Sequence, residues 1–402
     1  MSKTRTYERT HPWITFQLDL ERASWTLWTM LGECQSKCEH IARVPLKPGA
    51  ASELYRIFLG KGALASAAIE GNSLTEDQVQ ELLEGTLELP PSQSYLETEV
   101  QNIISGCNYI SDLVFKQGQE DLSPELIHKF NEIVLKDLEL PEDVIAGEFP
   151  PFGMGIGRYK AAPQEDRGYL LERLCDWINK DWRPEEARSS KREVGIIFGI
   201  LKAIVAHIYF EWIHPFGDGN GRTGRLIEFF ILVAAGAPLP AGHLLSNHYN
   251  LTRTEYYRRF DQSSKTNDGV ISFLRYAVGG LLDGLQTQLN LIRTEQLDVA
   301  WRNYVYEFFR DRTQSDVARR QQRLVLDLSL QSEAIPRSKL ATFSAKVQEL
   351  YSRTTDKTLL RDIKKLKENK LILEVEGGFI ANKERILAFL PPRRNPKTDD
   401  TK

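Results

Sequence analysis

Residues 214–225 of this 402-residue chain read HPFGDGNGRTGR and bring several reactive side chains into one short stretch. The glycines let backbone N–H groups approach an anion closely, because no Cβ stands in the way. Arg222 and Arg225 carry planar guanidinium groups whose shape fits phosphate oxygens. Asp218 is an oxygen ligand of the kind that Mg²⁺ takes beside phosphates, and His214 can exchange a proton near neutral pH. The stretch therefore predicts a polyphosphate site with a general base.

Other glycine-rich motifs fit this stretch poorly. Residues 219–224 match the GxGxxG pattern of dinucleotide-binding folds, but that site needs a preceding strand and an acidic residue about 20 positions later. Here residues 196–212 have helical spacing, and no acidic residue lies between Pro238 and Asn250. The lysine of a P-loop is missing, and Arg222 stands where an EF-hand needs an oxygen ligand. A plain glycine-rich helix cap would leave the convergence of histidine, aspartate and arginines unexplained.

Composition and cysteine usage indicate a folded protein of the cytoplasm. Hydrophobic residues make up 41% and aromatic residues 10% of the chain, which excludes wholesale disorder, and a net charge of −3 argues against a chain that is basic overall. Residues 1–12 lack the apolar run of a signal peptide, and no segment approaches the roughly 18 apolar residues of a membrane span. Four scattered cysteines fit buried free thiols in a reducing compartment. We expect a cytoplasmic protein that makes no use of a membrane.

Apolar residues recur at three- and four-residue spacing through most of the chain, which is the pattern of amphipathic helices. A chain of this length suits two or three domains. Residues 146–163 break the helical pattern with four glycines and three prolines, which predicts a loop or a short hairpin. The predicted helices before residue 290 are 16–40, 52–70, 75–84, 95–117, 123–138, 167–182, 190–212, 222–235, 252–265 and 269–288.

A second region begins near residue 318 and has the element order of a winged helix. Three helices over 318–331, 336–350 and 356–369 are followed by strands 372–376 and 379–382, which meet at a Gly-Gly turn. Residues 318–390 hold 15 Lys and Arg against 9 Asp and Glu, a surplus of 6 positive charges. Basic residues crowd the third helix, where a recognition helix would lie, so nucleic-acid contact and a plainly solvated face both stay open. These residues are Lys357, Arg361, Lys364, Lys365 and Lys367.

The stretch 214–225 resembles the signature of Fic proteins, His-Pro-Phe-x-(Asp/Glu)-Gly-Asn-Gly-Arg-x-x-Arg, at every position. The preceding helix with His207 and the later helix with Tyr256 and Tyr257 are also similar to the Fic core, so the resemblance covers roughly residues 50–285. It implies an all-α fold, a Fic-type helical bundle with a short β-hairpin flap at 146–163, here joined to the C-terminal winged helix. Most Fic proteins transfer AMP from ATP to a hydroxyl side chain of a target protein.

The resemblance also implies roles for the residues of the signature. His214 would accept the proton of the attacking Tyr, Thr or Ser hydroxyl, and Asp218 would hold Mg²⁺ at the α- and β-phosphates. Tyr256 and Tyr257 could line the adenine pocket, or one could pack in the core while the other is exposed. Gly221 stands where family members that phosphorylate have lysine. The residues implied to bind the ATP phosphates are Gly219, Asn220, Gly221, Arg222 and Arg225.

A second stretch, Ser66-Ala-Ala-Ile-Glu70-Gly71, resembles the inhibitory motif (Ser/Thr)-x-x-x-Glu-(Gly/Asn) of Fic proteins. Four-residue spacing places Ser66 and Glu70 on one face of a helix that Gly71 would end. In inhibited relatives this glutamate pairs with the second arginine of the signature, here Arg225, and so removes the partner of the γ-phosphate. The resemblance implies an autoinhibited enzyme, whereas the plain alternative is a helix end with a surface glutamate.

These patterns predict a protein adenylyltransferase that modifies a target protein, and itself, with release of pyrophosphate. Open alternatives are transfer of another nucleotide or of phosphocholine, removal of AMP from modified targets, and a DNA-binding regulator whose Fic core senses ATP. A homodimer and nucleic-acid binding through the winged helix also stay open. The predicted segments are an N-terminal helical region with the inhibitory helix (1–115), a Fic catalytic core (116–290), a helical linker (291–317), a winged helix (318–390) and a disordered tail (391–402).

Overall fold

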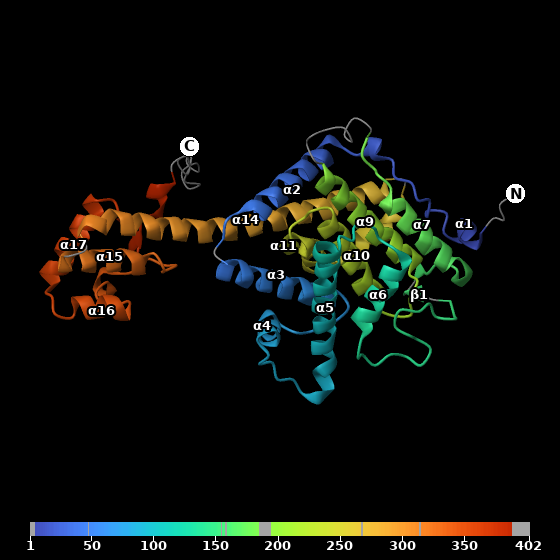
Figure 1. Ribbon diagram of the computed structural model, residues 1–402, viewed down its shortest axis with the longest axis horizontal. Helices are drawn as coiled ribbons and strands as arrows, with labels where there is room; N and C mark the ends of the chain where they lie inside the picture. Colours follow the sequence, from blue (N-terminus) through green and yellow to red (C-terminus); the bar gives the residue numbers. More distant parts are fainter. Residues whose placement is uncertain are drawn as a thin grey trace, which may run out of the picture. The chain divides into compact units, whose positions relative to one another are not determined.

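The computed structural model describes residues 5–46, 48–153, 155–156, 159–184, 194–266, 268–312 and 315–387. The chain divides into two compact units, Met1–Leu289 and Asn290–Lys402, and each unit is considered by itself. Nearly all regular structure is helical, and the strands form two small antiparallel hairpins (Figure 1). The predicted all-α class is therefore confirmed. The four cysteines are free and buried, as expected.

Local sequence signals set the starts of several helices in the first unit. Ser24, Thr75 and Ser123 each accept a hydrogen bond from the backbone N–H three residues later, which caps the helix that follows. The described helices of this unit are α1 (Thr6–Thr10), α2 (Trp25–Arg43), α3 (Pro48–Ile69), α4 (Glu76–Glu84), α5 (Ser94–Gln117), α6 (Pro124–Leu135), α7 (Arg167–Asn179), α9 (Gly195–Ile213), α10 (Asn220–Ala234), α11 (Leu239–Gly242), α12 (Leu244–Leu251), α13 (Arg253–Ser263) and α14 (Gly269–Phe309) up to Leu289.

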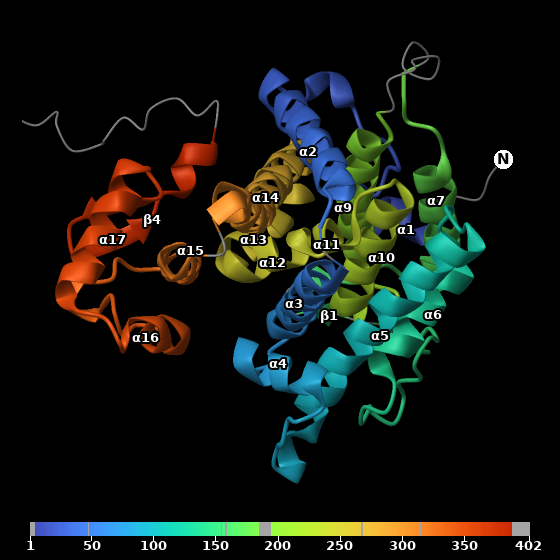
Figure 2. The same cartoon turned by 60° about the vertical axis from the view of Figure 1, so that its left-hand side comes forward.

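Helix α9 is the centre of this unit. It is buried on all sides, with 15 of its 19 residues in the core, and α10 lies beside it with α2, α5 and α7 around the pair (Figures 1 and 2). Helix α9 is long and apolar enough to cross a membrane, but buried core helices of folded domains meet the same criteria. Two glycines let α9 and α10 approach closely, because a Cβ on Gly199 would lie 2.2 Å from Ala235 Cβ and one on Gly224 would lie 2.9 Å from Glu211 Oε1.

The helices depart from the predicted pattern at three places. The helix predicted from residue 16 begins at Trp25, because Phe16 has a φ of 51° and Ser24 supplies the cap. Residues 239–251, which lie outside the predicted helices, form α11 and α12. Helix α14 extends beyond residue 288 to Phe309. The predicted start of α9 at residue 190 lies outside the described residues.

The predicted loop or hairpin at 146–163 is a hairpin of two short strands. β1 (Gly155–Ile156) pairs with β2 (Tyr159–Lys160) in antiparallel register. The fully buried Arg167 holds the segment that leads into β1. Its guanidinium donates to the carbonyl oxygens of Pro150 at 3.1 Å and Phe152 at 3.0 Å. On the other side, the N–H of Ala162 donates to the carbonyl oxygen of Ile213 at 3.2 Å. The hairpin is thereby fixed beside the residue that precedes His214.

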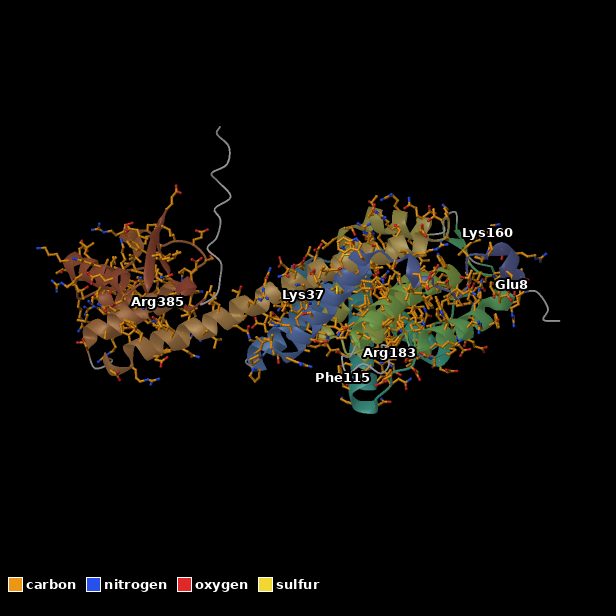
Figure 3. All side chains as sticks on the ribbon, turned by 90° about the horizontal axis from the view of Figure 1, so that it is seen from above. Glu8, Lys37, Phe115, Lys160, Arg183 and Arg385 are labelled. Carbon is orange, nitrogen blue, oxygen red and sulfur yellow. The ribbon has the colours of Figure 1, made fainter. Side chains whose placement is uncertain are left out.

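The N-terminal segment is tied to the same hairpin. His11 Nε2 lies 2.8 Å from the carbonyl oxygen of Lys160, and Asp166 accepts a hydrogen bond from the N–H of Tyr7 at 2.8 Å. Figure 3 shows Lys160 close to Glu8 of α1 at one end of the unit. Residues of the predicted N-terminal region and of the predicted catalytic core share one hydrophobic core.

The second unit has the predicted order of helices and strands. It contains α15 (Asp316–Leu328), α16 (Ala345–Tyr351), α17 (Asp356–Glu368) and the hairpin of β3 (Ile372–Val375) with β4 (Gly378–Ala381). A single bridge from Ile335 to Phe379 extends this hairpin by one further short strand. The second predicted helix is shorter than expected, because Pro336 opens a 3-10 turn and Ser344 caps α16. A winged helix stays our interpretation of this order.

The core of the second unit begins within the segment predicted to be a linker. Trp301, Val305 and Phe309 on α14 are fully buried against α15, α16, α17 and the hairpin. Residues 291–317 therefore contribute to the packing of this unit and do more than connect two domains. The predicted disordered tail, 391–402, lies outside the described residues.

Substituting Gly199 by alanine tests the close packing of α9 against α10. The added Cβ would meet Ala235 at 2.2 Å, so we expect the first unit to lose about 1–3 kcal/mol of unfolding free energy. Gly32→Ala on exposed α2 is the matched control, since nothing lies within 4 Å of its added Cβ, and it should stabilise by about 0.5–1 kcal/mol. Thermal unfolding of both variants provides the comparison, and equal midpoints would contradict the packing argument.

Candidate active site

The signature forms the turn that joins α9 to α10. His214 ends α9 with a φ of 47°, and its N–H donates to the carbonyl oxygen of Phe210 at 2.8 Å. Residues other than glycine rarely adopt this left-handed backbone conformation, so the packing around the turn must stabilise it. The imidazole is 7% exposed, and its Nδ1 lies 3.6 Å from Oε2 of Glu211, one helical turn earlier on α9. His214 thus has a defined position at the edge of the turn.

Side-chain hydrogen bonds close this turn from within. Phe216 donates its N–H to Oδ1 of Asn220 at 3.0 Å, and Nδ2 of Asn220 donates to the carbonyl oxygen of Phe216 at 2.7 Å. From α6, Nδ2 of Asn131 donates to the carbonyl oxygen of Asp218 at 2.9 Å. The side chain of Asn220 thus holds the turn in shape. Its amide nitrogen carries a second hydrogen, so the phosphate role of Asn220 stays a prediction.

The start of α10 has the backbone geometry of an anion site. Gly219 precedes the helix with a φ of 74°, and the first bond within the helix runs from the N–H of Thr223 to the carbonyl oxygen of Gly219 at 2.9 Å. The N–H groups of Asn220, Gly221 and Arg222 come before that bond and so point beyond the helix end. The helix dipole adds a partial positive charge at the same place.

Asp218 and Arg222 lie together at one side of this cradle. The carboxylate of Asp218 is 46% exposed, and its Oδ1 lies 3.3 Å from Nη2 of Arg222. Arg222 is itself buried, with Nη1 3.2 Å from Oε1 of Glu99 on α5. The guanidinium is therefore held by two carboxylates, one from its own turn and one from a helix more than a hundred residues away in sequence.

The site fits Mg²⁺ only in company with a nucleotide. Within the described ranges, no group of three or more His, Cys, Asp or Glu residues could hold a metal by itself. Mg²⁺ commonly takes one or two protein carboxylates and completes its shell with substrate phosphates and water. The half-exposed Asp218 beside the helix start meets that requirement.

The inhibitory motif and the signature meet as predicted. Nη2 of Arg225 donates to Oε1 of Glu70 at 2.7 Å and to the carbonyl oxygen of Ser66 at 2.9 Å. Nε of Arg225 donates to Oγ of Ser66, also at 2.9 Å. Arg225 is itself only 3% exposed. Ser66, Glu70 and Arg225 thus form one cluster between α3 and α10.

Gly221 is required for this cluster. A Cβ at Gly221 would lie 2.0 Å from Oε1 of Glu70 and 3.1 Å from Nη1 of Arg225. The carboxylate of Glu70 therefore lies directly against the first turn of α10, where the helix favours an anion. Glu70 therefore lies next to the backbone anion site.

Residues distant in sequence fix the end of α3 that carries Glu70. Gly71, with a φ of 109°, ends the helix, and Nδ2 of Asn72 donates to Oε2 of Glu99 at 2.9 Å. On the other side, Arg253 of α13 donates to the carbonyl oxygens of Ala68 and Ile69. Sequence reasoning missed Glu99 and Arg253, because neither belongs to a local motif and only the fold brings them to α3.

The two tyrosines of α13 have different environments. Tyr256 is 4% exposed, and its hydroxyl lies 2.9 Å from Nε2 of His207. Tyr257 is 49% exposed and donates to the carbonyl oxygen of Ile69 at 3.3 Å. One tyrosine thus lies in the core and the other is exposed, as one of the two alternatives has it, and an adenine-pocket role for either stays a prediction. Burial lowers the pKa of His207 to about 4, so this imidazole is neutral at neutral pH.

Comparison with known proteins identifies the domain. Residues 121–232, which run from α6 into the last turn of α10 and include the whole signature, match the Fic/DOC family. Protein adenylyltransferase fic-1 of Caenorhabditis elegans is 28% identical over 195 residues, 48% of this chain and 34% of the relative. Protein adenylyltransferase Fic of Drosophila willistoni is 30% identical over 181 residues, 43% of this chain and 32% of the relative. The chain thus spans about a third of the length of these two curated relatives.

Solved structures agree in fold. A Fic family protein from Desulfovibrio desulfuricans G20 has a TM-score of 0.53 at 19% identity, covering 93% of this chain and 94% of that chain. Fic-1 from Caenorhabditis elegans has a TM-score of 0.53 at 20% identity, covering 67% of this chain and 73% of that chain. Such identities support the fold alone, while the family match rests on the segment that holds the signature. This chain therefore contains a Fic domain of the Fic/DOC family.

Proposed function

We propose that this protein is an adenylyltransferase that transfers AMP from ATP to a hydroxyl side chain of a target protein. The observation that carries the proposal is His214, held by the end of α9 beside the free N–H groups at the start of α10. An imidazole next to an anion cradle suits a reaction in which a hydroxyl attacks a phosphate. Relatives with the same domain are named protein adenylyltransferases, which supports this reaction over the alternatives.

In the proposed reaction the N–H groups of Asn220, Gly221 and Arg222 bind phosphate oxygens, and Arg225 meets the γ-phosphate once it is free of Glu70. The target oxygen forms a bond to the α-phosphorus while the bond from that phosphorus to the bridging oxygen breaks. Pyrophosphate leaves with the electron pair, and the hydroxyl proton passes to Nε2 of His214. Asp218 would hold Mg²⁺, which when bound neutralises charge on the phosphates.

The hairpin of β1 and β2 suits the binding of an extended target segment by strand addition. The hairpin is short and the segment before it is held by Arg167. Ala162, which follows β2, is hydrogen-bonded to Ile213 next to the proposed base. A backbone paired with this hairpin would bring its side chains to the edge of the signature turn. We infer that the target presents its hydroxyl from an extended segment.

We further propose that Glu70 inhibits the enzyme. Its carboxylate occupies Arg225 and lies against Gly221, so the γ-phosphate would lose its arginine and meet a like charge. Asn72 and Arg253 support this role, because they fix the end of α3 that carries Glu70.

Glu70→Gly tests both the reaction and its inhibition. Removal of the carboxylate should raise AMP transfer at least tenfold, a change of ~1.4 kcal/mol or more. Intact-mass spectrometry after incubation with ATP and Mg²⁺ should show a gain of one AMP, and excess CTP, GTP, UTP or CDP-choline should not suppress it. Glu53→Gly, at the exposed start of α3, is the matched control. Equal labelling of the parent and the Glu70 variant would contradict inhibition by this residue.

His214→Ala in the Glu70→Gly background tests the proposed base. Loss of the imidazole should lower AMP transfer by roughly 100-fold or more, while ATP binding changes little, because the cradle is built from α10. Labelled AMP incorporation and ATP binding are measured on the same preparations. His40→Ala, on the exposed face of α2, provides the control. Undiminished transfer by the His214 variant would rule out this residue as the base.

A second function is favoured by the surface of the C-terminal unit, and we propose that α17 contacts nucleic acid. Leu359, Ile363 and Leu366 face the core, which leaves the opposite side of the helix exposed. Lys365 and Lys367 form ion pairs with Glu368 and Glu374. The remaining exposed basic residues of α17 share one face at three- and four-residue spacing, as a recognition helix would require, and they are Lys357, Arg361 and Lys364.

Replacing Lys357, Arg361 and Lys364 together by alanine tests this proposal. Each lost phosphate contact should reduce the slope of log affinity against log salt by about 0.9 for duplex DNA. Fluorescence anisotropy with duplex DNA and with RNA at several salt concentrations gives that slope. A control variant loses the same charge elsewhere in the unit, through alanine at Arg319, Arg337 and Lys346. Equal binding by both variants, or none by the parent at low salt, would contradict the proposal.

A further inference from the structure

Glu211 is a buried carboxylate that neither the signature nor the inhibitory motif contains. It lies on α9, one turn before His214, and is 8% exposed. Its Oε2 is 3.6 Å from Nδ1 of His214, and a Cβ on Gly224 would lie 2.9 Å from its Oε1. An ionised carboxylate is costly to bury unless a partner compensates for lost hydration. The position of Glu211 against the proposed base therefore requires an explanation.

The groups that face Glu211 keep it charged. Burial raises the pKa of this carboxyl, but its interaction with His214 and the nearby His207 and Arg225 outweigh burial, so the net pKa is below the ordinary value. His207 is neutral at neutral pH, and its Nε2 is engaged with the hydroxyl of Tyr256. The guanidinium of Arg225 is hydrogen-bonded to Ser66 and Glu70. His214 is thus the neighbour whose state Glu211 is placed to control.

A general base at His214 must present a bare Nε2, which requires the single proton of the neutral ring to be on Nδ1. Nδ1 is buried, and in the part of the chain that the structure describes it has no hydrogen-bond partner at normal distance. The acceptor that the structure places near Nδ1 is Oε2 of Glu211, at 3.6 Å. Long contacts of this kind commonly shorten when substrate binds.

We propose that Glu211 is a positioning residue whose carboxylate holds the proton of His214 on Nδ1 and so leaves Nε2 free to accept the target's proton. The inference rests on the proposed role of His214 as a base, and it adds the group that selects the ring's tautomer. A carboxylate behind a catalytic imidazole fulfils the same task in other enzymes. Gly224 makes the arrangement possible, because a side chain there would displace the carboxylate from between the helices.

Glu228 offers a matched control. It is also a buried carboxylate in the same core, but it lies on α10 and accepts a hydrogen bond from the hydroxyl of Tyr249 at 2.9 Å. Burial raises its pKa well above the ordinary value. Replacing Glu228 by glutamine disturbs a similar site without touching His214.

Nitrogen-15 NMR of the histidine-labelled full chain tests the tautomer directly. His214→Gln identifies the resonances of His214 by their loss. In the neutral ring of the parent protein, we expect the proton on Nδ1. Glu211→Gln should shift His214 toward the Nε2-protonated form that free histidine prefers, whereas Glu228→Gln should leave the tautomer unchanged.

The kinetic counterpart uses the Glu70→Gly background. Glu211→Gln should lower the rate of AMP transfer by roughly 10- to 100-fold with little change in KM for ATP, because the phosphate cradle stays intact. Glu211→Asp should restore part of the rate, and Glu228→Gln should stay within about threefold of the parent. A structural role for Glu211 would instead change rate, KM and thermal stability together.

A parent protein whose neutral His214 is protonated on Nε2 would overturn the inference, and this measurement needs no variant that must fold. An unchanged tautomer in Glu211→Gln would overturn it as well. A tautomer that shifts as expected in a protein that transfers no AMP would support the role of Glu211 and count against the proposed function. The two ideas can therefore fail separately.

Discussion

The close contact of α9 with α10 determines where every group of the site lies. Gly199 and Gly224 remove the side chains that would otherwise hold these helices apart. The turn between them is then short enough to place an imidazole from the end of one helix beside the free N–H groups at the start of the other. The side-chain amides of Asn220 and Asn131 form hydrogen bonds that keep this turn closed. The reactive geometry is thus a product of backbone packing in a dense core.

The second determinant is the way in which distant segments converge on that turn. Helix α3 brings Ser66 and Glu70 to Arg225, α5 brings Glu99 to Arg222, and α13 clamps the end of α3. Each of these contacts is an ion pair or a hydrogen bond, and Ser66, Arg222 and Arg225 are buried, which strengthens such interactions. The site is therefore coupled to three helices that lie outside the signature, and a change in any of them can reach it.

Much of this arrangement could be predicted from the sequence, and the parts that could not be predicted have physical reasons. The signature, the Glu70 pairing and most helices follow local rules of spacing and capping, and the structure places them as predicted. Asn220 was predicted to bind phosphate, and its two side-chain hydrogen bonds to the N–H and the carbonyl oxygen of Phe216 could not be read from the sequence. Glu99, Arg253 and Glu211 carry no signal in a single sequence, since only tertiary packing gives them partners.

The absence of a side chain at Gly221 is needed in the inhibited state and, in the proposed reaction, in the nucleotide-bound state. The space above its Cα admits the carboxylate of Glu70 now, and it would admit a phosphate in the working enzyme of the proposed kind. Escape from inhibition by mutation therefore has different consequences on the two helices. Changes on α3 can remove the carboxylate alone, whereas a side chain added at Gly221 to expel it also alters the seat proposed for the phosphate.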